Sequence, residues 1–475
     1  MSLKIEDEIE DFFVFEEQHE LFDLRYNNIK VWPVMRVGIF EEIFNEKGLS
    51  LGSSQNSDKS RDSKFFSRLF NLFHDFFSLF NIFNNVDILV INNDHKIKNI
   101  NEEQTTKLVW SIYESLQSDY EIALVNTQAI NFRSNRLKPI NISTFLSIFT
   151  KLSTWLIPNK KWNKIKLYLD SEIFKFYKIN LKWEKIYQSV FYRQIVLGHF
   201  LNLYLKLKNP KLIIFSDNGQ MSSINKVAFN NNIPTIDYQH AVLSDAYIIY
   251  NHNQKIVTKY KNYLSRHYFA WGNFRLSGYE NNYLCKVVGN AFFEHEMSKY
   301  PEVENDIDSL LIVSDGAYTR DDLTELAINI SSKFPEKNIF YKLRPEEYQT
   351  WKNHYSSEFL DRKNIIKLDN DKLSLYHFLL KSNFTIGTNS TVLLEASPVS
   401  KVIVFKKGWF FEMNDYIDSG LFMSGDTSEV IIEIIKSNRI SKSQITSNDI
   451  FKSNSLDLIN ISIKEIISNP PSPRD

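Results

Sequence analysis

Two polar turns, each at the end of an apolar run, bound the stretch of sequence that decides the fold. They lie in Tyr341-Lys342-Leu343-Arg344-Pro345-Glu346-Glu347 and in Ile386-Gly387-Thr388-Asn389-Ser390-Thr391-Val392-Leu393-Leu394-Glu395-Ala396. Each is typical of the carboxyl end of a buried strand, and open α/β sheets bind ligands beyond these ends. The pattern predicts an α/β fold with a ligand site along this edge.

The residue types in these turns indicate an anion. Lys342 and Arg344 stand two apart on a predicted strand, so they point to one face and repel each other unless an anion separates them. The second turn offers the hydroxyl and amide side chains of Thr388, Asn389, Ser390 and Thr391, followed by a helix start that favours phosphate.

We therefore predict a nucleotide-sugar site in which Glu395, about one helical turn further on, accepts the hydroxyls of a ribose. Two structural alternatives stay open. Glu346 or Glu347 pairs with one of the cations, and the hydroxyls of the second turn cap the next helix.

Composition sets broad limits on the function. A chain of 475 residues with a net charge of −1 predicts two or three domains and no nucleic-acid partner. The single cysteine, Cys285, excludes an internal disulfide and fits a reducing compartment. The acidic N-terminus lacks the core of a signal peptide, and no apolar run is long enough to span a membrane. We expect a cytoplasmic protein and leave open a place at the inner face of the cytoplasmic membrane.

Alternation of apolar runs with helical patterns predicts two Rossmann-like domains facing each other across a cleft, with added N-terminal helices. This is the glycosyltransferase-B architecture, although the periodicity equally permits an epimerase of the same build or a two-domain binding protein. The predicted units are a helical segment at 1–85 with a flexible linker at 49–64, an acceptor domain at 86–295 with a helical insertion at 140–205, a donor-binding domain at 306–440, and a tail at 441–475. Residues 296–308 are charged and without pattern, so we place the domain boundary there.

The first 85 residues contain two features open to more than one interpretation. Trp32 and Arg36 belong to a predicted packing helix, and they also suit the border of an acceptor cleft. Phenylalanines dominate residues 65–83 and cover more than half of a helix circumference. We favour packing in a core or against a partner over contact with a membrane surface, which remains possible for 65–83.

Four motifs in this order carry a resemblance to a known group of enzymes: Trp32-Pro33-x-x-Arg36, Gln239-His240, Tyr341-Lys342-Leu343-x-Pro345-x-Glu347-Tyr348, and Gly387-x-x-Ser390-Thr391-x-Leu393-x-Glu395-Ala396. Together they resemble bacterial glycosyltransferases of capsule and lipopolysaccharide O-antigen loci. These are similar to the wider group of sialyltransferases, polysialyltransferases and CDP-glycerol glycerophosphotransferases. The resemblance covers most of residues 26–40 and 210–430.

The resemblance implies roles for particular residues. The His-Pro motif that holds the donor phosphate in the wider group falls on Arg344-Pro345. Because arginine keeps its proton near neutral pH, its help to the leaving group would be electrostatic. The Ser/Thr motif falls on Ser390 and Thr391, and the acidic residue before a glycine falls on Asp217. A Gln-His-Gly motif is replaced by Gln239-His240-Ala241.

The residues themselves nominate further candidates at predicted strand ends. Asp217 is a catalytic base or an Asx-turn residue. His240 is a base, a donor to phosphate or acceptor, or a buried structural histidine. The turn Ser314-Asp315-Gly316 lines the cleft from the second domain, where Asp315 contacts donor or acceptor.

Motifs for metals and other cofactors are missing from the sequence. Asp369-Asn370-Asp371 is the nearest match to a metal-binding Asp-x-Asp, and a helix-entry cap explains it better. There is no zinc spacing, P-loop or dinucleotide fingerprint. We expect no metal and no cofactor, only the nucleotide-sugar donor as substrate.

The hypothesis is a metal-independent glycosyltransferase that acts on a glycan or lipid-linked glycan acceptor of a surface polysaccharide. Transfer of a polyol phosphate from a CDP donor by the same fold is one alternative. A non-catalytic subunit of a polysaccharide assembly complex is another.

Overall fold

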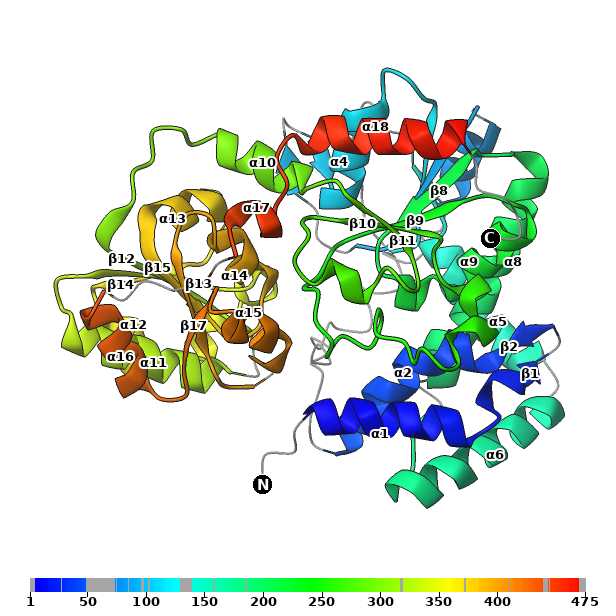
Figure 1. Cartoon of the computed structure of the whole chain (residues 1–475), viewed down its shortest axis with the longest axis horizontal. Coiled ribbons are helices and arrows are strands. Elements are labelled where there is room, and N and C mark those ends of the chain that lie inside the picture. Colours follow the sequence, from blue (N-terminus) through cyan, green and yellow to red (C-terminus); the bar gives the residue numbers. More distant parts are fainter. Residues whose placement is uncertain are drawn as a thin grey trace.

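The computed structural model describes residues 5–47, 73–94, 98–128, 139–183, 186–316, 319–370, 373–408, 410–438 and 443–469, apart from positions 27, 74, 84, 101–102, 157–158 and 444. These residues form two α/β domains that lie side by side, joined by α10 and the segment after it (Figure 1). The predicted linker at 49–64 lies outside the described residues.

In the described part of the chain, seven parallel strands form the sheet of the first domain, in the order β11-β10-β9-β8-β3-β6-β7. The strands at the centre of this sheet are buried along their whole length, as parallel strands covered on both faces must be. The strands are β3 (Ile88–Asn92), β6 (Ile122–Asn126), β7 (Ile140–Asn141), β8 (Leu212–Phe215), β9 (Thr235–Tyr238), β10 (His267–Ala270) and β11 (Leu284–Val287).

The order of these strands reverses between β3 and β8, which makes that point the topological switch of the first sheet. Helices cover both faces, and a short hairpin of β4 (Lys98–Ile100) and β5 (Glu103–Thr105) precedes the first of them. The helices are α4 (Lys107–Leu116), α5 (Ser143–Leu156), α6 (Asn159–Tyr177), the π-helix η3 (Ile186–Tyr192), α8 (Arg193–Leu207), α9 (Ser222–Asn230) and α10 (Ala291–Ser298).

The sheet of the second domain has the Rossmann order. Within the described residues, six parallel strands run β14-β13-β12-β15-β16-β17, so the switch lies between β12 and β15. The strands are β12 (Asp306–Val313), β13 (Asn338–Lys342), β14 (Ile365–Leu368), β15 (Ser382–Gly387), β16 (Lys401–Phe405) and β17 (Met423–Gly425). The helices are α11 (Arg320–Lys333), α12 (Ser357–Asp361), α13 (Leu375–Lys381), α14 (Thr391–Ala396), α15 (Asn414–Asp418) and α16 (Ser428–Lys436).

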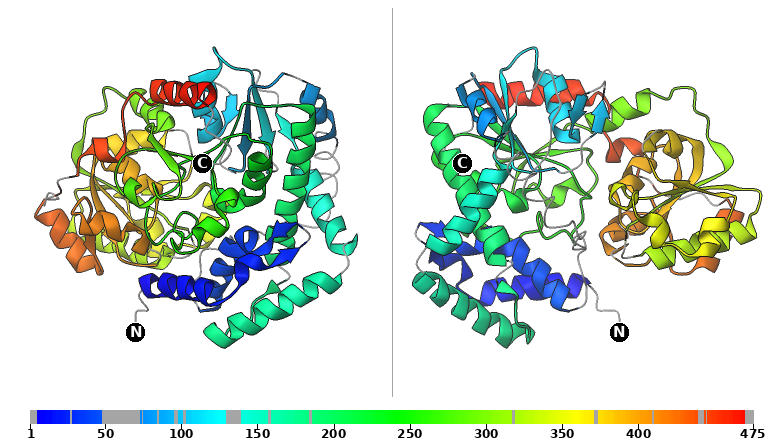
Figure 2. Two further views of the ribbon diagram at one scale, coloured as in Figure 1. Left: turned by 45° about the vertical axis from the view of Figure 1, so that its right-hand side comes forward. Right: turned by 180° about the vertical axis from the view of Figure 1, so that it is seen from behind.

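The first helices of the chain pack on the first domain together with α6 (Figures 1 and 2). They are α1 (Ile5–Gln18) and α2 (Val31–Glu46), separated by a hairpin of β1 (Arg25–Tyr26) and β2 (Ile29–Lys30). Arg36 is buried and forms an ion pair with Glu16 at 2.8 Å, and the indole of Trp32 donates to the same carboxylate at 2.6 Å. The packing interpretation of Trp32 and Arg36 is therefore confirmed, since both side chains are buried.

The tail returns to the first domain. It forms α17 (Ser447–Ile450) and α18 (Ser455–Ser468), and α18 lies beside α4 (Figure 1). Asn460 donates to the backbone oxygen of Ser115 at 2.7 Å. The path needs Gly289, because its φ is +77° and a Cβ there would lie 2.1 Å from the backbone oxygen of Lys452. The polypeptide therefore passes between the two domains twice, to the second domain after α10 and back to the first before α18.

Apolar contacts also join the two domains. Phe292 and Phe293 of α10 pack on the ring of Tyr376, with centroid distances of 6.2 and 6.0 Å. The hydroxyl of Tyr416 donates to the backbone oxygen of Leu243 at 3.1 Å. The carboxyl ends of the two sheets are therefore held at a defined separation.

The predicted α/β class with two Rossmann-like domains is confirmed by the two strand orders. One local expectation is wrong, because residues 296–308 contain the end of α10 and the start of β12. For residues 65–83, core packing does not hold at the described phenylalanines 73, 76, 77 and 80, each of which is more than half exposed. Packing of this segment against a partner stays a prediction. Among helices of the described residues, none has the length and apolar content needed to cross a membrane.

Candidate active site

Three predicted residues meet at the switch point of the second sheet. Asp315 follows β12, Thr388 follows β15, and Arg344 follows β13. One carboxylate oxygen of Asp315 accepts from the guanidinium of Arg344 at 2.9 Å, and the other accepts from the hydroxyl of Thr388 at 3.0 Å. Burial raises the pKa of Asp315 and the Arg344 charge opposes that rise. The side chain of Arg344 remains 42% exposed, so it can face a ligand while Asp315 orients it.

A buried carboxylate fixes the shape of these turns. Glu347 accepts from the backbone N–H of Arg344 at 3.0 Å and from the hydroxyl of Ser314 at 3.1 Å. Its other oxygen accepts from Tyr355 at 3.2 Å and from Arg320 at 3.4 Å. Of the alternative that Glu346 or Glu347 pairs with one of the cations, Glu347 binds the Arg344 backbone and pairs with Arg320, and the Glu346 side chain lies outside the described part of the structure.

The turn after β12 is built for close approach of the backbone to Arg344. Gly316 has φ of +74°, and its N–H donates to the Ser314 hydroxyl at 3.1 Å. A Cβ at Gly316 would lie 3.3 Å from Cδ of Arg344. Ser314, Asp315 and Gly316 thus stand beside the arginine.

The other residues predicted to bind phosphate are placed differently. Lys342 ends β13, donates to the Tyr348 hydroxyl and lies over that ring, while Arg344 lies beyond the strand. The expectation that the two cations share one strand face is wrong for this reason. Asn389 donates to Glu412 at 2.9 Å.

Ser390 caps α14 by accepting from the N–H of Val392 at 3.2 Å, so the capping interpretation is confirmed for that residue. Thr391 is the first residue of α14. That helix has only six residues, so its dipole is weaker than the sequence suggested.

Glu395 does not face a ribose site in this structure. Its side chain is fully buried and forms an ion pair at 2.6 Å with Lys107 of α4, in the other domain. The predicted ribose contact is corrected accordingly, because the carboxylate is committed to a contact between the domains.

The switch point of the first sheet carries Asp217. The hydroxyl of Ser216 donates to Asn93 across the switch at 3.3 Å, and Asp217 follows with φ of +69°, a conformation that costs a non-glycine residue about 1–3 kcal/mol. One carboxylate oxygen accepts from Gln220 at 2.8 Å, and Oδ1 is buried with no hydrogen-bond partner among the described residues. Burial, and secondarily the charge of Glu41, raises the pKa of Asp217 to about 7.

His240 and Tyr247 follow β9 and lie close to each other. The His240 ring lies 6.5 Å from that of Tyr247, and its Nδ1 is 3.4 Å from the Tyr250 hydroxyl. Tyr247 has a pKa raised far above its usual value, first by burial and then by the charges of Asp217 and Glu412. Glu412 belongs to the second domain, in η10 (Phe410–Met413).

The described residues contain no cluster of three or more side chains suited to a metal ion. Asp369 accepts from the indole of Trp351 at 3.3 Å and from Asn370 at 2.9 Å, and Asp371 lies outside the described residues. The first carboxylate of the Asp-x-Asp match, Asp369, is therefore hydrogen-bonded to nearby side chains.

Sequence reasoning missed Lys107, Tyr247, Glu347 and Glu412. Only Glu347 stood in a motif, and its role depends on partners that are distant in sequence. Tyr247 lies in a segment without helix or strand, and Glu412 lies in the four-residue 3-10 helix η10, so neither carries a clear sequence pattern.

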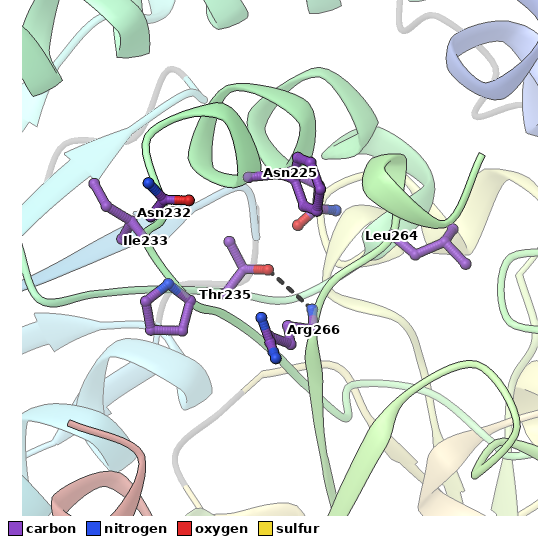
Figure 3. A pocket seen from close by; sticks show the side chains of 8 residues that line it. Asn225, Asn232, Ile233, Thr235, Leu264 and Arg266 are labelled. Carbon is purple, nitrogen blue, oxygen red and sulfur yellow. Dashed lines mark hydrogen bonds between the residues drawn. The ribbon is translucent and has the colours of Figure 1, made fainter. Parts of the chain in front are cut away.

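A small cavity of about 50 Å³ lies at the amino ends of β9 and β10, lined by residues that include Asn225, Thr235 and Arg266 (Figure 3). The backbone N–H of Arg266 donates to the Thr235 hydroxyl at 3.1 Å. Because parallel sheets bind ligands at the opposite edge, this cavity is separate from the candidate site.

No protein-family model matches the chain, and no curated protein matches it. Solved structures do resemble it. A UDP-GlcNAc 2-epimerase from Methanocaldococcus jannaschii is 13% identical, with a TM-score of 0.48, and the match covers 80% of this chain and 99% of that one. HepE from Anabaena, in complex with UDP, is 12% identical with a TM-score of 0.41 over 81% and 100% of the chains.

A Neisseria meningitidis UDP-GlcNAc 2-epimerase bound to UDP-GlcNAc is 12% identical, with a TM-score of 0.47 over 80% and 99% of the chains. The chain has a two-domain architecture of the glycosyltransferase-B type. The strand orders of the two sheets establish this independently of the comparisons.

Proposed function

We propose that the protein is a metal-independent glycosyltransferase that moves a sugar from a nucleotide-sugar donor to a glycan or lipid-linked glycan acceptor of a surface polysaccharide. One observation carries the proposal. The switch point of the second sheet presents a cation held by Asp315, and the switch point of the first presents Asp217 with a pKa of about 7.

On the donor side, the Arg344 guanidinium is the group that binds phosphate. Asp315 orients it, Thr388 holds Asp315, and the glycine turn at 316 lets the ligand approach the backbone. Charge-assisted hydrogen bonds to phosphate are about twice as strong as neutral ones. Arg344 therefore stabilises the negative charge that grows on the departing nucleotide phosphate.

On the acceptor side, Asp217 is the base. The acceptor oxygen attacks the anomeric carbon, the bond from that carbon to the donor phosphate breaks, and Asp217 takes the hydroxyl proton. A base with a pKa near the working pH combines sufficient ionisation with sufficient basicity. His240, whose Nδ1 is 3.4 Å from the Tyr250 hydroxyl, remains a candidate donor to the acceptor.

The proposal is tested by thermal denaturation of the full chain with CMP, CDP, UDP, GDP and TDP, with and without EDTA. A nucleotide that binds only the folded state at 100 times its Kd raises the stability by about 2.7 kcal/mol. We expect a shift with one nucleotide that EDTA does not change, and release of that nucleotide from its sugar donor when acceptor is added.

Other outcomes would point elsewhere. A shift confined to CMP and CDP, with transfer of a polyol phosphate, would replace the sugar donor by a CDP-polyol. Conversion of the donor sugar without any acceptor would make the protein an epimerase. Failure of all five nucleotides to bind would refute the proposal in favour of a non-catalytic subunit.

A further inference from the structure

A cavity of about 150 Å³ opens beside Asp217, between the sheet and the N-terminal helices. Its apolar wall comes from α2, η3, α8 and the segment after β9, through Val37, Val190, Leu197 and Ile249. Its polar wall consists of Glu41, Arg193, Gln194, Asp217 and Gln220. A cavity of this size holds one six-membered ring.

The buried oxygen of Asp217 lies at the wall of this cavity. A Cβ placed on Gly219 would meet Ile249 at 3.1 Å, Val37 at 3.2 Å and Oδ1 of Asp217 at 3.3 Å. Oδ1 therefore lies among the lining atoms, and among the described residues it has no hydrogen-bond partner. A hydroxyl of a ligand in the cavity would satisfy it.

Arg193 brings a cation to the same cavity. Its guanidinium donates to the backbone oxygen of Thr127 at 2.9 Å, and the carboxylates of Glu41 and Asp217 line the same cavity. Burial alone lowers the pKa of Arg193. An anionic group of a ligand would compensate this desolvated charge.

Gln194 is hydrogen-bonded within the protein and supports the wall of the cavity. The Gln194 side chain donates to the backbone oxygens of Val34 and Gly219 at 3.1 and 3.2 Å and accepts from the N–H of Ser223 at 3.1 Å. Val190 belongs to the π-helix η3, a form that is rare and frequent at functional sites. Gly38 allows the approach of α2, because a Cβ there would lie 3.0 Å from Val190.

We propose that this cavity binds the terminal ring of the acceptor, and that this ring is a sugar acid whose carboxylate contacts Arg193 and whose hydroxyl contacts Oδ1 of Asp217. The ring stacks its C–H face on the apolar wall. This inference rests on the proposed function, because the ligand of the cavity is an acceptor only if the protein is a transferase. It names the substrate class of the acceptor site. The binding itself needs no nucleotide.

The test is saturation-transfer NMR on the full chain with glucuronate and with glucose, without nucleotide. Glucuronate should bind and glucose should bind at least tenfold more weakly. Arg193→Met should weaken glucuronate about tenfold, since it removes a charge-assisted pair, and Arg193→Lys should restore part of the loss. Lys206→Met, an exposed change on the same helix, should have no effect.

Filling the cavity gives a second measurement. Val37→Phe should abolish glucuronate binding, and Leu203→Phe, an exposed site on α8, should leave it unchanged. Glucuronate that fails to bind the parent, or that binds Val37→Phe as it binds the parent, would overturn the inference. Arg193→Met tests it even if Val37→Phe does not fold.

The nucleotide titration separates this inference from the proposed function. Sugar-acid binding without any nucleotide binding would leave the cavity assigned and refute the transferase. Nucleotide binding without sugar-acid binding would keep the transferase and refute the cavity assignment.

Discussion

Replacing Asp217 with asparagine should change the stability of the protein in a way that depends on pH. The carboxyl ionises near 3.8 in an ordinary environment and at about 7 in the folded protein. Because this pKa is raised, the protonated carboxyl contributes its full stabilisation of the folded state below pH 3.8, and that contribution is lost as pH rises through 7. Above pH 7 the buried carboxylate is therefore a cost that the uncharged amide does not carry.

The magnitude follows from the difference between the two pKa values. At about 1.4 kcal/mol for each pH unit, the rise from 3.8 to about 7 corresponds to about 4 kcal/mol. Water entering the cavity screens part of this cost, so we expect about 2 kcal/mol. For a domain of 150–250 residues this is about 4–8 °C in Tm.

The assay is thermal denaturation of Asp217→Asn and the parent at pH 5 and pH 8, in buffers of equal ionic strength. The variant should gain stability relative to the parent as pH rises, and most of the gain should develop between pH 5 and pH 7. Glu280→Gln, an exposed carboxyl in the same domain, serves as the control and should show no such trend. A Tm difference for Asp217→Asn that is equal at both pH values would refute the burial of its charge. In the parent, kcat/KM should rise with pH through about 7, since the base must be ionised.

Three further changes test the ion pairs. Arg36→Met leaves the buried carboxylate of Glu16 without its cation and should cost about 3–5 kcal/mol, measured by chemical denaturation; an unchanged midpoint would contradict the pair. Lys107→Met strands Glu395 at the contact between the domains and should lower Tm. Adding Glu395→Gln should recover most of the loss, and failure of that rescue would count against the pair. Glu347→Ala should weaken nucleotide binding at a temperature where the variant is still folded, because Glu347 shapes the turn that carries Arg344. An affinity equal to that of the parent would show that the turn holds without Glu347.

Much of the fold could be predicted because buried parallel strands are short apolar runs that end in polar turns. The runs before Asp217, Asp315 and Arg344 are of this kind, so their strands and strand ends could be located. The edge strands β7 and β17 are only two and three residues long and leave no such pattern. Short edges are positioned by their neighbours in the sheet.

Contacts within the site were harder to predict. That Arg344 stands near an acidic turn follows from the topology, but its pairing with Asp315 depends on the three-dimensional register of two strands. The partner of Glu395 is 288 residues away, in the other domain. A local motif cannot show that a side chain pairs with a residue so distant in sequence. The sequence therefore predicts a ribose contact for a carboxylate that forms an ion pair in the structure.

Isothermal titration of the nucleotide that gives the largest thermal shift is the most direct test of the donor site. The titration compares the parent, Arg344→Ala, and Arg362→Ala, whose arginine pairs with Glu358 on the surface of the same domain. A charge-assisted contact is worth about 1.5–3 kcal/mol, so Arg344→Ala should weaken binding by about 10-fold to 100-fold. Arg362→Ala should bind as the parent does. Equal affinity of the parent and Arg344→Ala would contradict the assignment of the donor phosphate to this switch point.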